Sequence, residues 1–287
     1  MSLDTSWFSE ICVEAGSAFS LKITEKLHHE TTPYQTIDIY ATEKYGNLMV
    51  LDGFVMLTDR DNAIYHEMMS HPALFTHPNP KRVAIIGGGD CGTLKEVLKH
   101  EQVEHAYLIE IDERVTEVSK QYFPSLTEVC SDPRAHVCHE DGVKWIKDEK
   151  NLDIILIDST DPIGAAASLF SQDFYQDCFT ALSETGIIVH QSESPLIHKD
   201  IILPMHRSMI AAGYRSTQTL HFFQSCYPSG WWTCTLAAKG DLDLTQFNRQ
   251  QAENKTFETF YYNAEMHQGA MAQPEFLKRA LASTSKS

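Results

Sequence analysis

A glycine-rich segment, Gly87-Gly88-Gly89-Asp90-Cys91-Gly92, has the spacing G-x-G-x-x-G and directly follows the apolar run 83–86. Between a strand and a helix, this spacing lets the backbone approach a ligand closely. Glu110 lies about 18 residues beyond Gly92, where an acidic side chain can hydrogen-bond ribose hydroxyls. The segment and Glu110 together indicate a nucleoside-bearing ligand. The alternative is that the glycines serve only tight packing of a strand against a helix.

Asp90 restricts the chemistry of that ligand. Two unit charges about 4 Å apart interact by roughly 4 kcal/mol at an effective dielectric constant near 20. A carboxylate at this turn therefore disfavours the pyrophosphate of a dinucleotide and also the carboxylate of S-adenosylmethionine. It favours a ligand that carries an amine at this end. The simpler alternative is that Asp90 only caps a helix.

Two further acids, Asp158 and Asp161, directly follow the apolar run 154–157. Ligands of open α/β sheets bind outside the carboxyl ends of the strands, so we expect these acids near Asp90. No basic residue accompanies them in the sequence, and an unpaired cluster of carboxylates attracts a cation. For Asp161 alone, a solvated Asp-Pro turn is the simpler interpretation.

The elements that must position these acids alternate between strand and helix. Helical stretches such as 93–99 and 112–122 separate apolar runs typical of buried strands, which cover 83–86, 106–109, 154–157 and 187–189. Repeated β-α-β units predict a doubly wound, mostly parallel, Rossmann-like α/β sheet. Later in this region, Asp141-Gly142 either accepts a hydrogen bond from an adenine amino group or forms an ordinary turn.

A small antiparallel β unit is expected before this sheet. Strands over 36–40, 48–51 and 54–57 are separated by the turn signals Gly46-Asn47 and Asp52-Gly53. A helix is expected over 59–71. The predicted domains are therefore a small β domain over residues 1–58 and a Rossmann-like catalytic domain over residues 59–287, which includes a helical C-terminal tail.

The charge of the chain excludes several classes of partner. The 287 residues include 23 Lys and Arg and 39 Asp and Glu, which gives a formal net charge of -16. This charge repels nucleic-acid phosphates and anionic membrane surfaces, so we expect no nucleic acid and no membrane as partner. The chain opens without a basic segment followed by an apolar run, which predicts a cytoplasmic protein.

Histidine and cysteine patterns predict no metal site. His66 and His71 are five positions apart, whereas a zinc-binding helical pair is separated by four. The seven cysteines never occur as C-x-x-C, so reduced thiols are expected. Cys91 lies where a helix N-terminus can lower the pKa of a thiol, and we expect it to be sensitive to alkylation.

Short motifs occur in order along nearly the whole chain: Tyr34-Gln35, Leu51-Asp52-Gly53, Tyr65-His66-Glu67-Met68-Met69, the segment 87–92, Glu110-Ile111-Asp112, Asp141-Gly142, Asp158-Ser159-Thr160-Asp161-Pro162, Tyr227-Pro228-Ser229-Gly230 and Tyr261-Tyr262-Asn263. With these motifs the chain resembles the polyamine aminopropyltransferases, the family of spermidine synthase.

The resemblance implies transfer of the aminopropyl group of decarboxylated S-adenosylmethionine to putrescine, which yields spermidine and 5'-methylthioadenosine. It implies no metal, no permanently bound cofactor, and a homodimer or homotetramer. Asp158 is implied as the proton acceptor. Around the nucleoside the family pattern places Gln35, Gly87, Gly89, Asp90, Glu110, Asp141 and Gly142. On the diamine side it places Tyr65, His66, Asp90, Asp158, Asp161, Gln191 and Tyr227.

Departures from the family pattern leave the amine acceptor open. Cys91 stands where the family usually has glycine, the run Gly164-Ala165-Ala166-Ala167 lacks an expected proline, and Trp231 and Trp232 are bulkier than expected. Cadaverine or spermidine are therefore alternative acceptors. A methyltransferase that uses intact S-adenosylmethionine is the alternative enzyme, which Asp90 disfavours. A fold that only senses a polyamine or a nucleoside is the non-enzymatic alternative.

Overall fold

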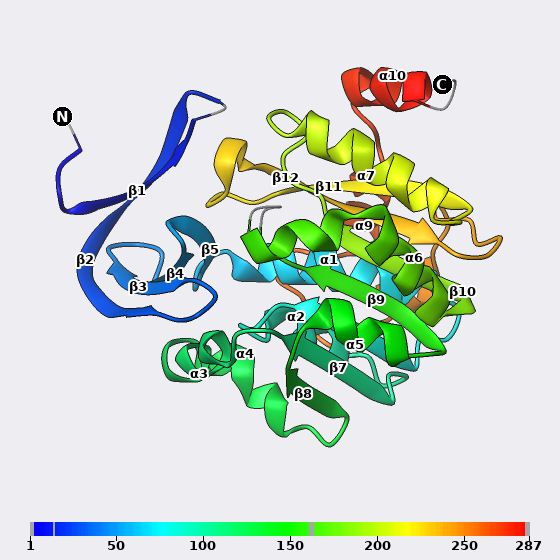
Figure 1. Cartoon of the computed structure of the whole chain (residues 1–287), viewed down its shortest axis with the longest axis horizontal. Coiled ribbons are helices and arrows are strands. Elements are labelled where there is room, and N and C mark those ends of the chain that lie inside the picture. The colour runs from blue at the N-terminus through cyan, green and yellow to red at the C-terminus, as the bar shows by residue number, and fades with distance from the viewer. Residues whose placement is uncertain (1–2, 14, 161–163, 285–287) are drawn as a thin grey trace.

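The computed structural model describes residues 3–13, 15–160 and 164–284, in which a small N-terminal sheet lies beside a larger sheet covered by helices (Figure 1). The N-terminal sheet is antiparallel, and its strands follow the order of the chain. These strands are β1 (Trp7–Cys12), β2 (Ser17–Thr31), β3 (Thr36–Thr42), β4 (Asn47–Leu51) and β5 (Phe54–Thr58).

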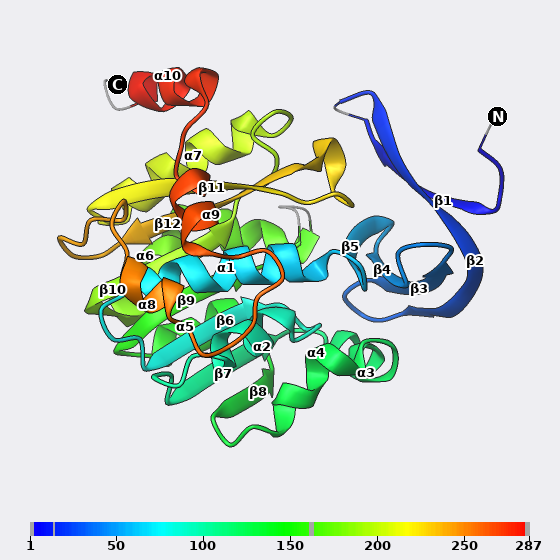
Figure 2. The ribbon, with the colours of Figure 1, turned by 180° about the vertical axis from the view of Figure 1, so that it is seen from behind.

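The three strands expected before residue 58 are confirmed as β3, β4 and β5. Ile37 and Ile39 alternate along β3 and are fully buried, which is the pattern that predicted it. Strands β1 and β2 were not predicted individually. They form a ribbon at the periphery of the molecule (Figures 1 and 2), and Leu21 is the only buried residue of β2. A strand that buries so little apolar surface has no clear sequence signal.

The larger sheet contains seven strands in the order β11-β12-β10-β9-β6-β7-β8 within the described residues. The run from β10 to β8 is parallel, and β12 is antiparallel to both of its neighbours. The predicted doubly wound, mostly parallel Rossmann-like sheet is therefore confirmed. Its strands are β6 (Arg82–Gly87), β7 (His105–Glu110), β8 (Ala135–His139), β9 (Leu152–Asp158), β10 (Leu182–Gln191), β11 (Ser216–Phe223) and β12 (Trp231–Ala238).

Helices connect these strands and cover both faces of the sheet (Figures 1 and 2). The α-helices are α1 (Asn62–Thr76), α2 (Gly92–Leu98), α3 (Glu113–Tyr122), α4 (Pro124–Thr127), α5 (Gly142–Asp148), α6 (Gln172–Ala181), α7 (Lys199–Ala211), α8 (Arg249–Glu253), α9 (Ala264–Ala270) and α10 (Glu275–Thr284). The short 3₁₀ helices are η1 (Glu128–Ser131), η2 (Gly164–Phe170) and η3 (Pro228–Gly230). Among the described residues, no helix combines the length and apolar character needed to cross a membrane.

Strand β6 shows why the central strands could be recognised in the sequence. Val83 and Ile85 pack in the core that contains α1 and α2, whereas Ala84 and Ile86 pack in the core that contains α5, α6 and α7. Both faces of the strand are thus buried, which requires a continuous apolar run rather than an alternating one.

Helix α1 extends further than the predicted range 59–71, because it continues through Pro72 to Thr76. A proline inside a helix cannot donate to the carbonyl four residues earlier, here that of Met68. The thiol of Cys234 donates to the Met68 oxygen instead, at 3.6 Å. This contact with β12 compensates for the missing backbone bond and helps the helix to pass the proline.

The N-terminal sheet packs against the larger unit through α3. Val115 and Val118 of α3 share a buried core with Ile39, Met49 and Leu57 of the small sheet. Since α3 begins shortly after the carboxyl end of β7, this core holds the small sheet over the edge of the larger sheet at which its parallel strands end.

Candidate active site

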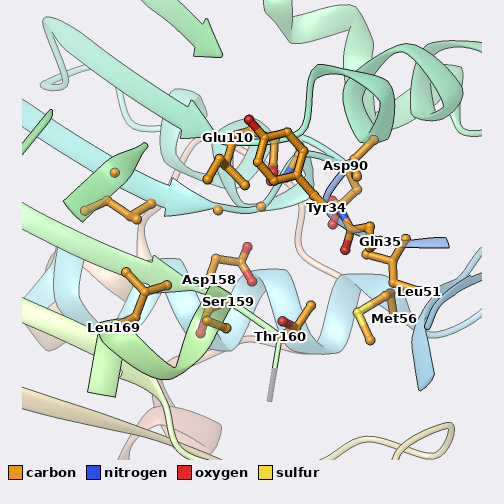
Figure 3. A pocket seen from close by; sticks show the side chains of 18 of the residues that line it. Tyr34, Gln35, Leu51, Met56, Asp90, Glu110, Asp158, Ser159, Thr160 and Leu169 are labelled. Carbon is orange, nitrogen blue, oxygen red and sulfur yellow. The ribbon is translucent and has the colours of Figure 1, made fainter. Parts of the chain in front are cut away.

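A cavity of about 280 Å³ lies where the carboxyl ends of β6, β7 and β9 face the N-terminal sheet. Figure 3 shows Glu110 and Asp90 on one side of it and Asp158 with Ser159 and Thr160 on the other. A cavity of this kind, with several polar groups pointing inward, is typical of a small-molecule site. The predicted residues that line it are Gln35, Tyr65, His66, Gly87, Gly89, Asp90, Glu110, Asp141, Gly142, Asp158 and Tyr227.

The glycine turn brings the ends of β6 and β9 into contact. Gly87 has φ +84°, and a Cβ atom on it would lie 2.2 Å from the carbonyl oxygen of Asp158. The next residue, Gly88, donates its N–H to that same oxygen at 2.9 Å. No other residue type fits at position 87 without moving Asp158, so the first glycine of the motif also sets the position of the acid.

Asp158 is half-buried and held by two neutral donors. The Tyr65 hydroxyl donates to its Oδ1 at 2.7 Å, and the Thr93 hydroxyl donates to its Oδ2 at 2.6 Å. Burial raises the pKa of Asp158, and the negative charge of Asp90 raises it further. The carboxylate is therefore oriented and more basic than a surface aspartate. Thr93 was missed in the sequence, because a threonine in the first turn of a helix is too common to be a signal.

Asp90 both stabilises the start of α2 and faces the cavity. Its Oδ1 accepts a hydrogen bond from the Gly92 N–H at 2.6 Å and lies 3.2 Å from Nε2 of His66. Burial lowers the pKa of His66, but the Asp90 carboxylate outweighs this and raises it overall. No basic residue lies close to Asp90 in the sequence, but the fold supplies His66 from α1 as its partner.

Glu110 is the last residue of β7 and lines the cavity. Its two oxygens accept N–H groups from Gly89 at 3.1 Å and Asp112 at 2.9 Å. Burial raises the pKa of Glu110 to about 7. Two other lining residues are also held by hydrogen bonds: the Gln35 amide donates to Asp112 at 3.0 Å, and Asp141 accepts the N–H of Val143 at the start of α5.

Gln191 lies in a smaller cavity of about 40 Å³ that shares Tyr65, Tyr227 and Met56 with the larger one. The rings of Tyr65 and Tyr227 contact each other with centroids 5.8 Å apart. The two cavities are therefore neighbours along one wall. Asp161, the remaining predicted site residue, lies outside the described residues.

Two acids near the smaller cavity were not predicted. Glu10 lines it, and its side chain accepts the N–H of Val55 at 2.7 Å. Burial raises the pKa of Glu10 to about 6, and the charge of Glu193 contributes in the same direction. Glu193 accepts a hydrogen bond from Gln191 at 3.0 Å and lies 3.2 Å from His198. An acid among the apolar residues of β1 was the available signal for Glu10.

The expected lowering of the Cys91 pKa is wrong. The Cys91 thiol is fully buried, and its hydrogen bond with Cys130 together with burial raises its pKa. The hydrogen bond and burial thus outweigh the effect of the helix N-terminus.

His66 and His71, which the sequence presented as a pair, lie in different environments. His66 faces the cavity, whereas His71 is buried between Glu96 and His100. Over residues 3–13, 15–160 and 164–284, no group of three or more His, Cys, Asp or Glu side chains is arranged to hold a metal ion.

Comparisons with known proteins agree with this architecture. Residues 62–248 match the spermine/spermidine synthase domain, and residues 6–59 match the spermidine synthase tetramerisation domain. A polyamine aminopropyltransferase of Thioalkalivibrio sulfidiphilus is 57% identical over 98% of this chain and 99% of that protein. A polyamine aminopropyltransferase of Nitrosococcus oceani is 54% identical over 97% of this chain and 98% of that protein.

Solved structures of spermidine synthases have the same fold. One, in complex with the transition state analogue AdoDATO, is 35% identical with a TM-score of 0.94, over 99% of this chain and 97% of that chain. The spermidine synthase from Thermotoga maritima is 36% identical with a TM-score of 0.91, over 96% of this chain and 94% of that chain. The resemblance found in the sequence is therefore confirmed, and the chain belongs to the spermine/spermidine synthase family of aminopropyltransferases.

Proposed function

We propose that this enzyme transfers the aminopropyl group of decarboxylated S-adenosylmethionine to putrescine, yielding spermidine and 5'-methylthioadenosine. The observation that carries the proposal is the order of acids along the two neighbouring cavities. Glu110, Asp90 and Asp158 line the larger cavity, where we place the nucleoside beside Glu110, and Glu10 lines the smaller cavity. A series of carboxylates beside a nucleoside site suits two cationic substrates. The solved relative in complex with AdoDATO supports the same chemistry.

The reaction needs alignment and a free lone pair. A putrescine nitrogen attacks the carbon that joins the aminopropyl chain to the sulfonium, and the electrons of the broken C–S bond remain on sulfur. Methylthioadenosine leaves as a neutral thioether, and the nitrogen loses a proton. Correct alignment of the two substrates alone contributes about 7–11 kcal/mol.

Asp158 is proposed as the group that accepts this proton. An amine with a pKa near 10.4 is almost fully protonated at pH 7, and removing its proton costs roughly 4.6 kcal/mol. The raised pKa of Asp158 reduces this cost, and Tyr65 and Thr93 hold its carboxylate in one orientation. Each carboxylate oxygen keeps a further lone pair for the substrate.

The two nitrogens of the diamine need different surroundings, because a cluster of carboxylates also stabilises the charged form of an amine. We place the reacting nitrogen beside Asp158, where the rings of Tyr65 and Tyr227 exclude water. The distal nitrogen remains an ammonium ion in the smaller cavity, where the carboxylate of Glu10 balances its charge. Glu193 adds a second negative charge near Glu10.

A competition assay tests the proposal and determines the acceptor. Purified enzyme is given decarboxylated S-adenosylmethionine with equal amounts of putrescine, cadaverine and spermidine, and the products are identified by mass spectrometry. We expect spermidine and methylthioadenosine in equal amounts. If only cadaverine or only spermidine is converted in the mixture, putrescine is refuted as the acceptor. If no amine product forms, the transferase assignment for these substrates is refuted.

Calorimetry separates this activity from methyl transfer. The amine of the decarboxylated cofactor is attracted to Asp90, whereas the additional carboxylate of intact S-adenosylmethionine is repelled by it. We expect the decarboxylated form to bind about tenfold or more tightly. Equal or weaker binding of the decarboxylated form would favour a methyltransferase.

We infer that the active form is a homodimer or homotetramer assembled through the N-terminal sheet. The match of residues 6–59 to a tetramerisation domain supports this, as does the ribbon of β1 and β2 that extends from the chain (Figure 2). Size-exclusion chromatography with light scattering should give the mass of two or four chains. A monomer at micromolar concentration would contradict the inference.

A further inference from the structure

Two cysteines meet behind the glycine turn. The sulfur atoms of Cys91 and Cys130 lie 3.5 Å apart in hydrogen-bonding contact. Cys91 directly follows Asp90 and has the left-handed backbone conformation, with φ 68°, at the start of α2. Cys130 belongs to η1, which packs against α2. Neither thiol takes part in the proposed reaction. Cys91, however, directly follows Asp90, the carboxylate proposed to bind the amine of the cofactor.

The two thiols differ in accessibility and acidity. Cys91 is fully buried, whereas Cys130 is partly exposed. The hydrogen bond with Cys91 lowers the pKa of Cys130 to about 7 despite partial burial, and the positive charge of Lys120 helps. Cys130 is therefore the more acidic and the more accessible thiol of the pair, and thiolates are the form that oxidants attack.

We propose that Cys91 and Cys130 form a reversible disulfide in the presence of hydrogen peroxide, and that this bond deforms the glycine turn and weakens cofactor binding. The Cys130 thiolate attacks one peroxide oxygen, the O–O bond breaks, and Cys130 becomes a sulfenic acid as hydroxide leaves. The Cys91 sulfur then attacks the Cys130 sulfur, its proton joins the departing hydroxyl as water, and an S–S bond forms. The sulfur atoms together lose the two electrons that the peroxide gains.

Closure of the bond requires movement at the site. An S–S bond is about 2.05 Å long, so the sulfurs must approach each other by about 1.5 Å. The segment after η1 is anchored, because the Arg134 guanidinium donates to the carbonyls of Leu98 at 2.6 Å and His100 at 3.1 Å. The turn that carries Cys91 contains two glycines with positive φ and is easier to deform. Asp90 would therefore shift with Cys91.

Peptide mapping tests the bond without relying on the proposed function. The reduced full-length protein is treated with equimolar hydrogen peroxide, alkylated with iodoacetamide and digested with trypsin. Residues 83–95 and 121–134 form tryptic peptides that contain only Cys91 and only Cys130, respectively. We expect a linked peptide that is two hydrogen atoms lighter than the sum of both peptides and that disappears after treatment with dithiothreitol.

Two variants provide the controls. Cys130→Ser should form no linked peptide and should keep its affinity for decarboxylated S-adenosylmethionine after peroxide treatment. Cys138→Ser removes another partly exposed thiol, one whose pKa burial raises, and should behave like the wild type. In the wild type, oxidation should weaken cofactor binding by about tenfold or more, and dithiothreitol should restore it. Oxidation of the wild type should also accelerate amide hydrogen exchange in residues 83–95.

The outcomes distinguish this inference from the proposed function. A Cys130 that oxidises to sulfinic acid without a linked peptide would overturn the disulfide. A linked peptide with unchanged hydrogen exchange and cofactor affinity would overturn its effect on the turn. If the reduced protein does not bind the cofactor, the proposed function fails, and the linked peptide and hydrogen exchange still decide whether the thiol pair deforms the turn.

Discussion

The Tyr65 hydroxyl donates a 2.7 Å hydrogen bond to Oδ1 of Asp158 and so connects helix α1 to the carboxyl end of β9. Tyr65 also contacts Tyr227, which lies between the two cavities. One side chain thus orients the proposed proton acceptor and forms part of the wall along which the diamine would lie. This relationship leads to the first two predictions.

Asp158→Asn should reduce kcat by about 100-fold or more, because an amide cannot accept the proton of the attacking amine. The affinity for methylthioadenosine, measured by calorimetry, should change little. Asp153→Asn is a suitable control, since Asp153 lies near the start of the same strand and binds the backbone of Lys81 and Arg82. Turnover near that of the wild type would refute the proposed role of Asp158.

Tyr65→Phe should shift the acid limb of the pH profile of kcat to higher pH. The Tyr65 hydrogen bond favours the ionised carboxylate and lowers the pKa of Asp158, so its removal raises that pKa. More of the acceptor is then protonated at a given acidic pH, and activity is lost earlier as the pH falls. Tyr175→Phe, which removes a buried hydroxyl that contacts His190, should leave the limb unchanged. Identical profiles for both variants would contradict the prediction.

Asp90→Asn should weaken binding of decarboxylated S-adenosylmethionine by about tenfold or more. Methylthioadenosine lacks the aminopropyl amine and should bind almost as it does to the wild type. The asparagine can still accept the Gly92 N–H, so the start of α2 should remain intact. Isothermal calorimetry with both ligands measures the difference, and equal losses for the two would argue against a contact between Asp90 and the amine.

Putrescine binding should strengthen as the pH rises from 5 to 7, with a midpoint near the Glu10 pKa of about 6. Glu10 is neutral below its pKa and does not attract an ammonium ion, and it becomes an anion above it. Both amines of the diamine remain charged over this range, so the change reports on the protein. Binding is measured at each pH with methylthioadenosine present.

Glu10→Gln should weaken diamine binding at pH 7 and flatten this pH dependence. Glu25→Gln, a change at an exposed position on β2, should retain both the affinity and the slope. A wild-type slope in Glu10→Gln would show that another group controls diamine binding.

The central strands were predictable because burial on both faces leaves a continuous apolar run, as in Ile154 to Ile157 of β9. The convergence of Asp90, Glu110 and Asp158 was also predictable, since parallel strands end at one edge of a sheet. Strand β1 was not, because a peripheral strand with few buried side chains carries little pattern.

Local sequence therefore determined the fold class, the glycine turn and the acids at the strand ends, because each depends on neighbouring residues and on the periodicity of one element. The partners of those acids emerged only from tertiary contacts. Tyr65 and Asp158 are 93 positions apart, and Cys91 and Cys130 are 39 apart, yet each pair is in contact. Which side chains meet across such separations depends on how helices pack on the sheet, and burial at those meeting points sets the pKa of each group.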